Sequence, residues 1–524
     1  MRDARRAFAR LPSLRMARVP DAPALPVRDP WPGDPARGAR LLKGELDLGG
    51  GTRALRPGFW AEPSGPLLLR ASAHGFTWLR DLRALGTDAA RLRARALVAD
   101  WIATGASDPV AQRPDVAGAR IAAWLGHYDF FFAAADDSFR QRLMARLVAD
   151  ARGLSAALPP EEIDARALTA LKGLIAAAVA LPEHGGFLAR AQRFLPQEIA
   201  RQVAGDGSQP ERSPTALLAA LQDLTEIRAL LQAAQAPPPV PLGPAIERMA
   251  GALRALRHGD GGLALFNGSK EEHAQLIELV LTQAGRPGRA PSALPEGGFH
   301  RLAAGRTVIL ADCGAPPPPG LDRLAHAGTL SFEMSVGRER LIVNCGAFPA
   351  GGAEWRDAAR ATAAHSTLVI ADVNSSELRP EGLGRRPLKV EAQRQEANGA
   401  HWLQASHDGW MKPFGALHLR QLYLAESGED LRGEDVIEAA TPQAFAIRFH
   451  LHPSVHANLQ QDGAAALLRL PGGGGWRLRA DGARLAIEES VYLGGPEPRR
   501  AEQVVLSGAA DGPQHVKWAI SKVK

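Results

Sequence analysis

The chain has 524 residues, a formal net charge of +6 and a hydrophobic content of 45%. These values are typical of a soluble globular protein with two or more domains. No run of residues approaches the length of a membrane-spanning helix, so none is expected. The N-terminal segment has the arginines of a signal peptide but lacks the uninterrupted apolar stretch that must follow them, so no secretory signal is predicted.

The basic residues are almost all arginine, since lysine occurs only eight times. A GC-rich genome explains this bias, and the functional alternative is that arginines bind carboxylates or sulfates through two hydrogen bonds. No dense basic run interleaved with aromatic residues occurs, so nucleic acid is not an expected partner. The two cysteines, Cys313 and Cys345, each follow a predicted strand, and either a disulfide or two buried thiols is consistent with this placement.

The first half of the chain predicts helices. Residues 1–40 are rich in proline and arginine, and we expect poor order there. A helical domain is predicted over 41–258, with one helix that begins after Thr87 as its N-cap and another that begins with Ser213 as N-cap and Pro214 as its first residue. Seven or so helices joined by short loops predict antiparallel helical hairpins.

The hydrophobic period changes from 3.6 to 2 in the second half. Residues 259–296 are predicted to connect the domains, and 297–524 contain more than ten short apolar runs separated by Gly, Pro and Asp. Many strands without an intervening helix predict a large antiparallel β-sandwich. The expected fold class is therefore α+β, with a helical domain first and a sandwich second.

The stretch "AHAGTLSFEMSVGRERLIVNCGAF", residues 325–348, predicts a β-hairpin. Its first strand alternates apolar and polar residues, which indicates one buried face, and "GRER" turns the chain into a returning strand. His326 stands before the first strand and Asn344 after the second, while His365 begins a third apolar run in "AAHSTLVIAD". Polar residues at the ends of neighbouring strands form either a site or three unrelated surface positions.

This hairpin and its continuation resemble the heparinase II/III family of polysaccharide lyases. "DGSQPERSP" in the helical half and "HGDGGLALFNGS" between the domains are also similar to family segments. The resemblance implies an incomplete α/α toroid followed by a β-sandwich, and β-elimination of acidic, uronate-containing polysaccharides. It also implies a periplasmic or cell-envelope location, with a cytoplasmic one as the alternative because no signal peptide is visible.

β-Elimination needs a base that removes the C5 proton of the uronate, an acid for the leaving oxygen, and groups that neutralise the carboxylate. The family's tyrosine falls on Ala216 in this sequence, and the family's Asn or His of an earlier helix has no counterpart in "EEIDARALTAL". We therefore predict His365 and His450 as the catalytic residues, since a neutral histidine is a natural base or acid near pH 7.

Contacts with substrate are predicted from three short segments. The family-like stretch before Pro214 either contacts the substrate or is only a loop that ends in a helix N-cap. The segment "WRDAARATAAH" carries two arginines four residues apart, which either bind a substrate carboxylate or lie on a solvated helix face. In "RFHLHP" the second histidine either faces the substrate or is an exposed strand end. The candidates are Gln209, Glu211, Arg212, Arg356, Arg360 and His452.

The resemblance also implies a metal site. The family's ligands, a His, an Asp and a His, correspond to His326, Asn344 and His365. Two histidines and a carboxylate suit zinc or another divalent ion when a water fills the fourth position, and Asn344 removes one negative charge from this set. The alternatives are a metal site and a hydrogen-bonded structural set. For the protein as a whole, the two alternatives are a lyase and a non-catalytic protein that binds acidic glycans. Its oligomeric state is not predicted.

Overall fold

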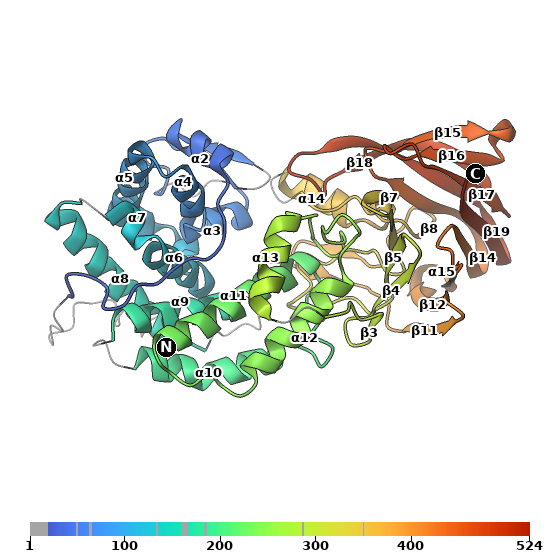
Figure 1. The fold of residues 1–524 in the computed structure, drawn as a ribbon. Helices are drawn as coiled ribbons and strands as arrows, with labels where there is room; N and C mark the ends of the chain where they lie inside the picture. The colour runs from blue at the N-terminus through green and yellow to red at the C-terminus, as the bar shows by residue number, and fades with distance from the viewer. Residues whose placement is uncertain are drawn as a thin grey trace. The chain divides into compact units, whose positions relative to one another are not determined.

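The computed structural model describes residues 19–48, 51–61, 65–132, 135–159, 166–182, 186–285, 288–348 and 351–523. By its internal contacts the chain divides into two compact units. Unit one comprises residues 1–202, 219–246 and 349–352, and unit two comprises residues 203–218, 247–348 and 353–524. Figure 1 shows that helices dominate the first part of the chain and strands the second.

Unit one is built from helices with one small hairpin, β1 (Glu45–Asp47) and β2 (Thr52–Ala54). Thr87 caps α5 as predicted, because its side chain accepts a hydrogen bond from the Ala90 N–H. The helices that lie in this unit are α2 (Pro35–Leu42), α3 (Leu67–Gly75), α4 (Leu79–Leu85), α5 (Asp88–Thr104), α6 (Pro114–Gly126), α7 (Tyr128–Phe132), α8 (Asp137–Ala157), α9 (Ala167–Ala180) and α10 (Phe187–Gln202). α11 (Pro214–Ala233) and α12 (Leu242–Ala255) have residues in both units.

Helices α6 and α9 approach each other at the level of the backbone. A Cβ atom on Gly118 would lie 2.6 Å from the Thr169 carbonyl oxygen, and one on Gly173 would lie 2.3 Å from Gly118 Cα. Only glycine fits at both positions, which explains why two otherwise apolar helices keep a residue of poor helix propensity.

Helix α2 begins at Pro35, inside the segment 1–40 for which the sequence predicts poor order. Asp34 caps it by accepting hydrogen bonds from the Ala36 and Arg37 N–H groups. The composition of this segment hid a short capped helix, and residues 1–18 lie outside the described part of the chain. Among the described residues, no helix combines the length and apolar character needed to cross a membrane.

Unit two contains the sheet. Its helices are α13 (Ala274–Ala284), α14 (Gly352–Arg360) and α15 (Met411–Phe414). Its strands are β3 (Ala293–Leu294), β4 (Phe299–Ala304), β5 (Thr307–Asp312), β6 (Phe332–Val336), β7 (Glu339–Val343), β8 (Leu368–Ile370), β9 (Leu378–Arg379), β10 (Gly382–Leu383), β11 (Val390–Ala397), β12 (Ala400–Trp410), β13 (Ala416–Leu424), β14 (Asp430–Leu451), β15 (His456–Gln460), β16 (Ala465–Arg469), β17 (Gly475–Asp481), β18 (Arg484–Tyr492) and β19 (Arg499–Lys522).

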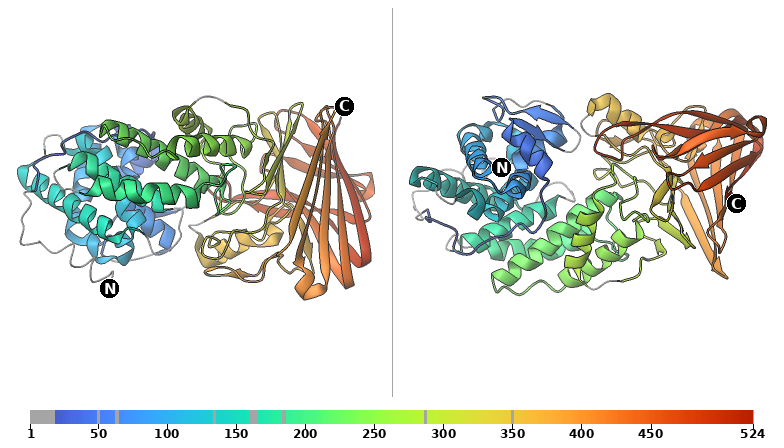
Figure 2. Two further views of the ribbon diagram at one scale, coloured as in Figure 1. Left: turned by 90° about the horizontal axis from the view of Figure 1, so that it is seen from below. Right: turned by 45° about the horizontal axis from the view of Figure 1, so that its top comes forward.

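One antiparallel sheet connects all of these strands except the β9–β10 hairpin. The long strands β14 and β19 pair along most of their length, and each also pairs with different neighbours near its two ends. In both views of Figure 2 the strands from about residue 390 onward lie side by side in a curved sheet. The predicted order, helices followed by a large antiparallel β-structure, is confirmed.

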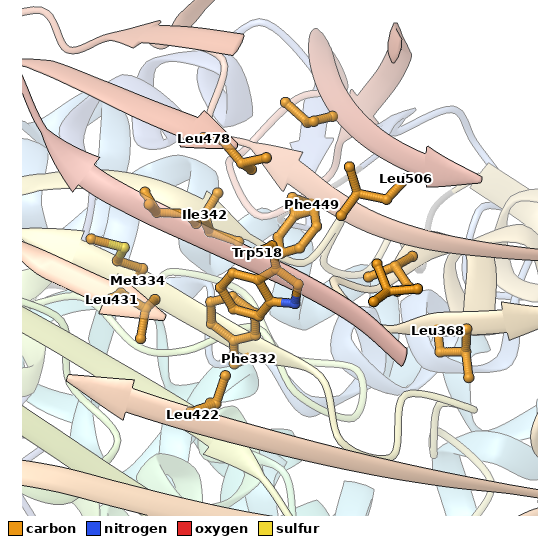
Figure 3. Close-up of a cluster of buried hydrophobic side chains, with 14 of the residues drawn as sticks. Phe332, Met334, Ile342, Leu368, Leu422, Leu431, Phe449, Leu478, Leu506 and Trp518 are labelled. Atoms are coloured by element: carbon orange, nitrogen blue, oxygen red, sulfur yellow. The ribbon is translucent and has the colours of Figure 1, made fainter. Parts of the chain in front are cut away.

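The curved sheet encloses an apolar core. Phe332 stacks on Trp518, with ring centroids 5.7 Å apart, and Phe449 packs edge-on against the same indole. Figure 3 shows these rings surrounded by aliphatic side chains from several strands. Burial of large aromatic side chains of this kind supplies much of the stabilisation of a β-domain.

The predicted hairpin is confirmed as β6 and β7, with Met334 opposite Ile342. The expected solvent face is wrong, however, because Glu333 and Ser335 are as buried as their apolar neighbours. The strand is covered on both faces, so its polar residues must find partners inside the protein. Cys313 and Cys345 are free, buried thiols, one of the two alternatives left open by the sequence.

Candidate functional site

The two histidines that flank the hairpin are in contact within unit two. His326 Nδ1 lies 2.9 Å from His365 Nε2, and the rings meet edge to face with centroids 5.0 Å apart. Asn344 does not share their hydrogen bond: its Oδ1 accepts from the backbone N–H of Ser366, the residue after His365, at 2.9 Å. The predicted trio is therefore a histidine pair with an asparagine bound to the neighbouring backbone.

The hydrogen bonds define the tautomers of the pair. His365 Nδ1 donates to the Ala361 carbonyl at 2.8 Å, so its Nε2 must accept the proton of His326 Nδ1. His326 Nε2 in turn accepts from the Gly268 N–H at 3.0 Å. Burial lowers the pKa of His365 to about 4 and that of His326 well below its usual value, so both rings are neutral at pH 7.

His450 is also buried, neutral and hydrogen-bonded at both ring nitrogens. Its Nε2 donates to the Ala363 carbonyl at 2.9 Å, and its Nδ1 accepts from the Ser490 hydroxyl at 2.7 Å. The side chain is buried, and burial lowers its pKa to about 3. Neither His365 nor His450 presents a free ring nitrogen to a substrate in this structure. The geometry thus gives no support to the catalytic roles predicted for them.

The family-like loop before α11 folds back on its own unit. The Arg212 Nε donates to the Gly297 carbonyl at 2.7 Å, and its terminal nitrogen donates to the Asp312 carboxylate. The guanidinium also lies 4.8 Å from the centre of the Phe299 ring. With its side chain buried and these two donors engaged, Arg212 holds the loop in this structure, and its contact with a substrate stays a prediction. Its φ of +52° shows that the loop is held in an unusual backbone conformation.

Gln209 in the same loop is different. It is buried, and neither its side-chain oxygen nor its nitrogen has a hydrogen-bond partner among the described residues. An unpaired buried amide costs about 1–3 kcal/mol per polar group, which makes Gln209 a reasonable position for a ligand contact. Glu211, nearby in the loop, is half-buried. Substrate binding by these two residues stays a prediction.

The two arginines of α14, Arg356 and Arg360, differ in burial and in their contacts. Arg360 is buried and donates to the carbonyls of Ala325, Arg379 and Gly382 at 2.6–3.0 Å. It joins three chain segments in this structure, and its contact with a substrate carboxylate stays a prediction. Arg356 stays partly exposed beside Asp357, its sequence neighbour.

Glu333 is the central polar residue that the sequence analysis missed. Its carboxylate accepts from His258 Nε2 at 2.8 Å, from the Asn344 N–H at 2.9 Å and from the Leu265 N–H at 3.2 Å, with no solvent exposure. It ties the hairpin to the segment "HGDGGLALFNGS". The alternation of β6 assigned Glu333 to a solvent face, and no feature of the sequence shows that residues 258–268 cover that face.

One titratable cluster in unit two reaches solvent. His452 Nε2 lies 3.5 Å from Glu271 Oε1, and the Tyr492 hydroxyl donates to the same carboxylate. The His452 side chain is 18% exposed and that of Glu271 31%. Burial raises the pKa of Glu271, but the His452 hydrogen bond, the Arg340 charge and the Tyr492 hydrogen bond outweigh it, so the pKa falls to about 2. Of the predicted site histidines, only His452 is accessible.

Comparison with known proteins identifies the chain. Residues 286–519 match the model of the heparinase II/III-like C-terminal domain. The FtsZ-localized protein C of Caulobacter vibrioides is 33% identical over 95% of this chain and 89% of that protein. The chain belongs to the heparinase II/III-like family.

Solved structures of polysaccharide lyases share this heparinase-like fold. The crystal structure of heparinase III covers the whole chain with a TM-score of 0.74 at 13% identity, and 89% of that structure is matched. The heparan sulfate lyase HepC from Pedobacter heparinus also covers the whole chain, with a TM-score of 0.61 at 16% identity over 88% of its own length. The predicted fold class, an α/α toroid followed by a β-sandwich, is confirmed.

The resemblance to the heparinase family aligns an alanine with the family's tyrosine. Ala216, at the family's tyrosine position, lies in the first turn of α11, where its N–H is 3.4 Å from the Ser213 hydroxyl that caps the helix. A methyl group cannot exchange a proton with a substrate. The N-cap prediction for Ser213 is confirmed by this contact.

The side chains at the family's metal position do not fit a metal ion as they stand. The four ring nitrogens of His326 and His365 and the Asn344 Oδ1 are already in hydrogen bonds. Within the described ranges, no group of three or more His, Cys, Asp or Glu side chains is placed to hold a metal. Metal ligation by His326, Asn344 and His365 stays a prediction, and an ion there would replace the hydrogen bond between the two rings.

Zinc is expected to leave the stability of this protein unchanged. Binding to the folded state would raise the thermal midpoint by mass action, whereas a pair that must first break two buried hydrogen bonds gains little from the ion. Thermal unfolding of EDTA-treated protein, with and without a tenfold excess of zinc, measures this directly. A rise of the midpoint with zinc that His326→Ala abolishes would restore the metal site.

Proposed function

We propose that this heparinase-like protein works by binding at the site of cell division, and that its inherited lyase centre does not carry out β-elimination. The claim that β-elimination does not take place rests on the burial and hydrogen bonding of three histidines. His326, His365 and His450 are buried, neutral and engaged at both ring nitrogens, and by resemblance Ala216 takes the place of the family's tyrosine. No base of the inherited centre is left to abstract a C5 proton.

The first half of the proposal rests on the Caulobacter vibrioides relative. That protein is named for its localisation with FtsZ, and its similarity to this chain extends over nearly the full length of both. The 33% identity to that protein is about twice the 13–16% identity to the lyases of similar fold, which favours a role shared with the Caulobacter vibrioides protein. FtsZ, or an assembly that contains it, is therefore the proposed partner, and acidic glycans come second.

Localisation in living cells tests this proposal. A fluorescent fusion of the full chain is expected to coincide with labelled FtsZ at the division site, and purified protein is expected to bind purified FtsZ of the same organism. A fusion that carries His365→Ala should localise equally well if binding, not the inherited centre, is the function. An even distribution through the cell together with no binding to FtsZ would overturn the proposal.

A lyase remains the second candidate because of one observation. His452 and Glu271 are partly exposed, and the buried Tyr492 donates its hydroxyl to the same Glu271 carboxylate that His452 contacts. Burial raises the pKa of Tyr492, so its hydroxyl stays protonated and continues to donate to Glu271. In this candidate His452 abstracts the C5 proton of an acidic polysaccharide. Release of unsaturated uronate that His452→Ala abolishes would support it.

A further inference from the structure

A hollow of about 710 Å³ lies on the outer face of the sheet in unit two, over β11, β12, β13, β14, β19 and β17. It contains none of the residues discussed above as candidates for the lyase centre. The strand registers arrange its side chains in two adjacent rows across the six strands. The polar row is Gln393, Gln404, Gln421, Glu434, Lys517 and Asp481, and the aromatic row is Gln395, Trp402, Tyr423, Arg432, Ala519 and Arg479.

The aromatic row offers a platform for a flat apolar surface. Trp402 is 41% exposed although it is a large hydrophobic residue, and its ring lies 5.0 Å from the Tyr423 ring at a tilt of 48°. The exposed tryptophan and the half-buried tyrosine therefore present ring surface to solvent. The C–H faces of a sugar ring are an apolar surface of matching size.

The glutamines beside the platform supply unused hydrogen-bonding groups. Over the part of the chain that the structure describes, no hydrogen bond is recorded for the side chains of Gln393, Gln395, Gln404 or Gln421. Each amide offers two donors and one acceptor, the pattern that vicinal sugar hydroxyls match. A row of such amides next to an aromatic pair indicates a ligand rich in hydroxyl groups.

The hollow is lined by three basic side chains, Arg432, Arg479 and Lys517, and two acidic ones, Glu434 and Asp481, and the two arginines offer a place for an acidic group. Arg432 and Arg479 stand on either side of Ala519, the smallest side chain of the aromatic row, and neighbouring strands lie about 4.8 Å apart. A carboxylate above Ala519 is therefore within reach of both guanidinium groups. Arg432 has one acidic partner, Asp430 at 2.8 Å, and no ion pair with a described residue is recorded for Arg479.

The backbone argues against a peptide added as a strand. β12, β13, β14 and β19 each pair with neighbours on both sides, so their N–H and C=O groups are already used within the sheet. Recognition on this face has to come from side chains. We propose that the hollow binds an oligosaccharide that carries carboxylate groups, with a sugar ring on Trp402 and Tyr423 and a carboxylate between Arg432 and Arg479. This site is independent of the proposed role at the division site.

Isothermal titration of the full chain with a hyaluronan octasaccharide tests the site, with neutral chitohexaose as the comparison. Wild type is expected to bind the acidic chain more tightly. Trp402→Ala should weaken both ligands about tenfold through loss of the stacking surface. Arg479→Gln should remove most of the preference for hyaluronan. Trp355→Ala, which removes an equally exposed tryptophan from α14, is the matched control and should bind as wild type.

Two results would overturn the assignment. One is the absence of binding to hyaluronan, and the other is wild-type affinity in Trp402→Ala. Both mutated tryptophans are largely at the surface, so the variants are expected to fold, and their thermal midpoints check this. If Trp402→Ala instead abolishes binding to FtsZ and leaves the glycan titration unchanged, the face belongs to a protein partner and the glycan proposal fails.

Discussion

Glu333→Ala is expected to lower the free energy of unfolding by about 3–5 kcal/mol, because it removes the buried carboxylate that holds three donors. The His258 ring and the Leu265 and Asn344 N–H groups would be left without this acceptor in a region closed to water. Unit two would lose the link between its hairpin and the segment that covers it. Urea unfolding followed by tryptophan fluorescence gives the magnitude.

Glu391→Ala is the matched control. Glu391 is an exposed glutamate on strand β11, and no hydrogen bond or ion pair with a described residue is recorded for it. Its replacement is expected to change the unfolding free energy by no more than about 0.5 kcal/mol. Equal effects of the two substitutions would show that Glu333 is not the anchor described here.

Acid is expected to destabilise the protein steeply between pH 6.5 and 4. The pKa of His365 in the folded protein is lowered to about 4 and that of His450 to about 3, from an ordinary value near 6.5. The unfolded chain therefore binds more protons in this range, so stability is fully present above pH 6.5 and is lost as the pH falls. Each histidine contributes about 3 kcal/mol to the loss by pH 4.

The slope with pH, rather than the stability at one pH, is the informative quantity. His450→Gln should flatten the fall in unfolding free energy between pH 6.5 and 4, even if the variant is less stable at pH 7. Other buried histidines, such as His326 and His407, also have lowered pKa values, so part of the dependence of the unfolding free energy on pH is expected to persist in this variant. An unchanged slope in His450→Gln would mean that His450 is accessible and charged near pH 6.

The architecture could be predicted from local patterns. The N-caps Thr87 and Ser213 and the hairpin around Phe332 each depend on a few neighbouring residues, and each was confirmed, although the solvent face expected for the first strand was wrong. The helix α2 was missed because prolines and arginines around it suggested disorder, although Asp34 is an ordinary N-cap.

The candidate site could be predicted only in part, because its chemistry depends on contacts between distant residues. The pairing of His326 with His365 is consistent with their placement at strand ends, but the acceptors that fix their tautomers are backbone atoms that carry no sequence signal. Arg212 and Arg360 illustrate the same limit, since their partners are mostly carbonyl groups of remote loops. An arginine that binds a substrate and one that holds loops together look alike in a sequence.

For the hollow on the outer sheet face, the direction of the side chains can be predicted from the sequence, but their neighbours cannot. Trp402, Tyr423 and Arg432 lie on three different strands, and only the strand registers bring them into one row. The alternation of each strand predicts that these side chains face outward. Which of them are neighbours depends on pairing that a single sequence does not define.

The most direct test of the central claim is the ultraviolet absorbance of unsaturated uronate. Purified protein is mixed with heparan sulfate, hyaluronan, alginate and the capsular polysaccharide of the organism that makes the protein. Each mixture is measured with zinc and with a chelator. The account predicts no rise above the rate without protein on any of these substrates. A rise that survives His452→Ala but disappears in His365→Ala would contradict it, because the buried histidine pair would then be a working lyase centre.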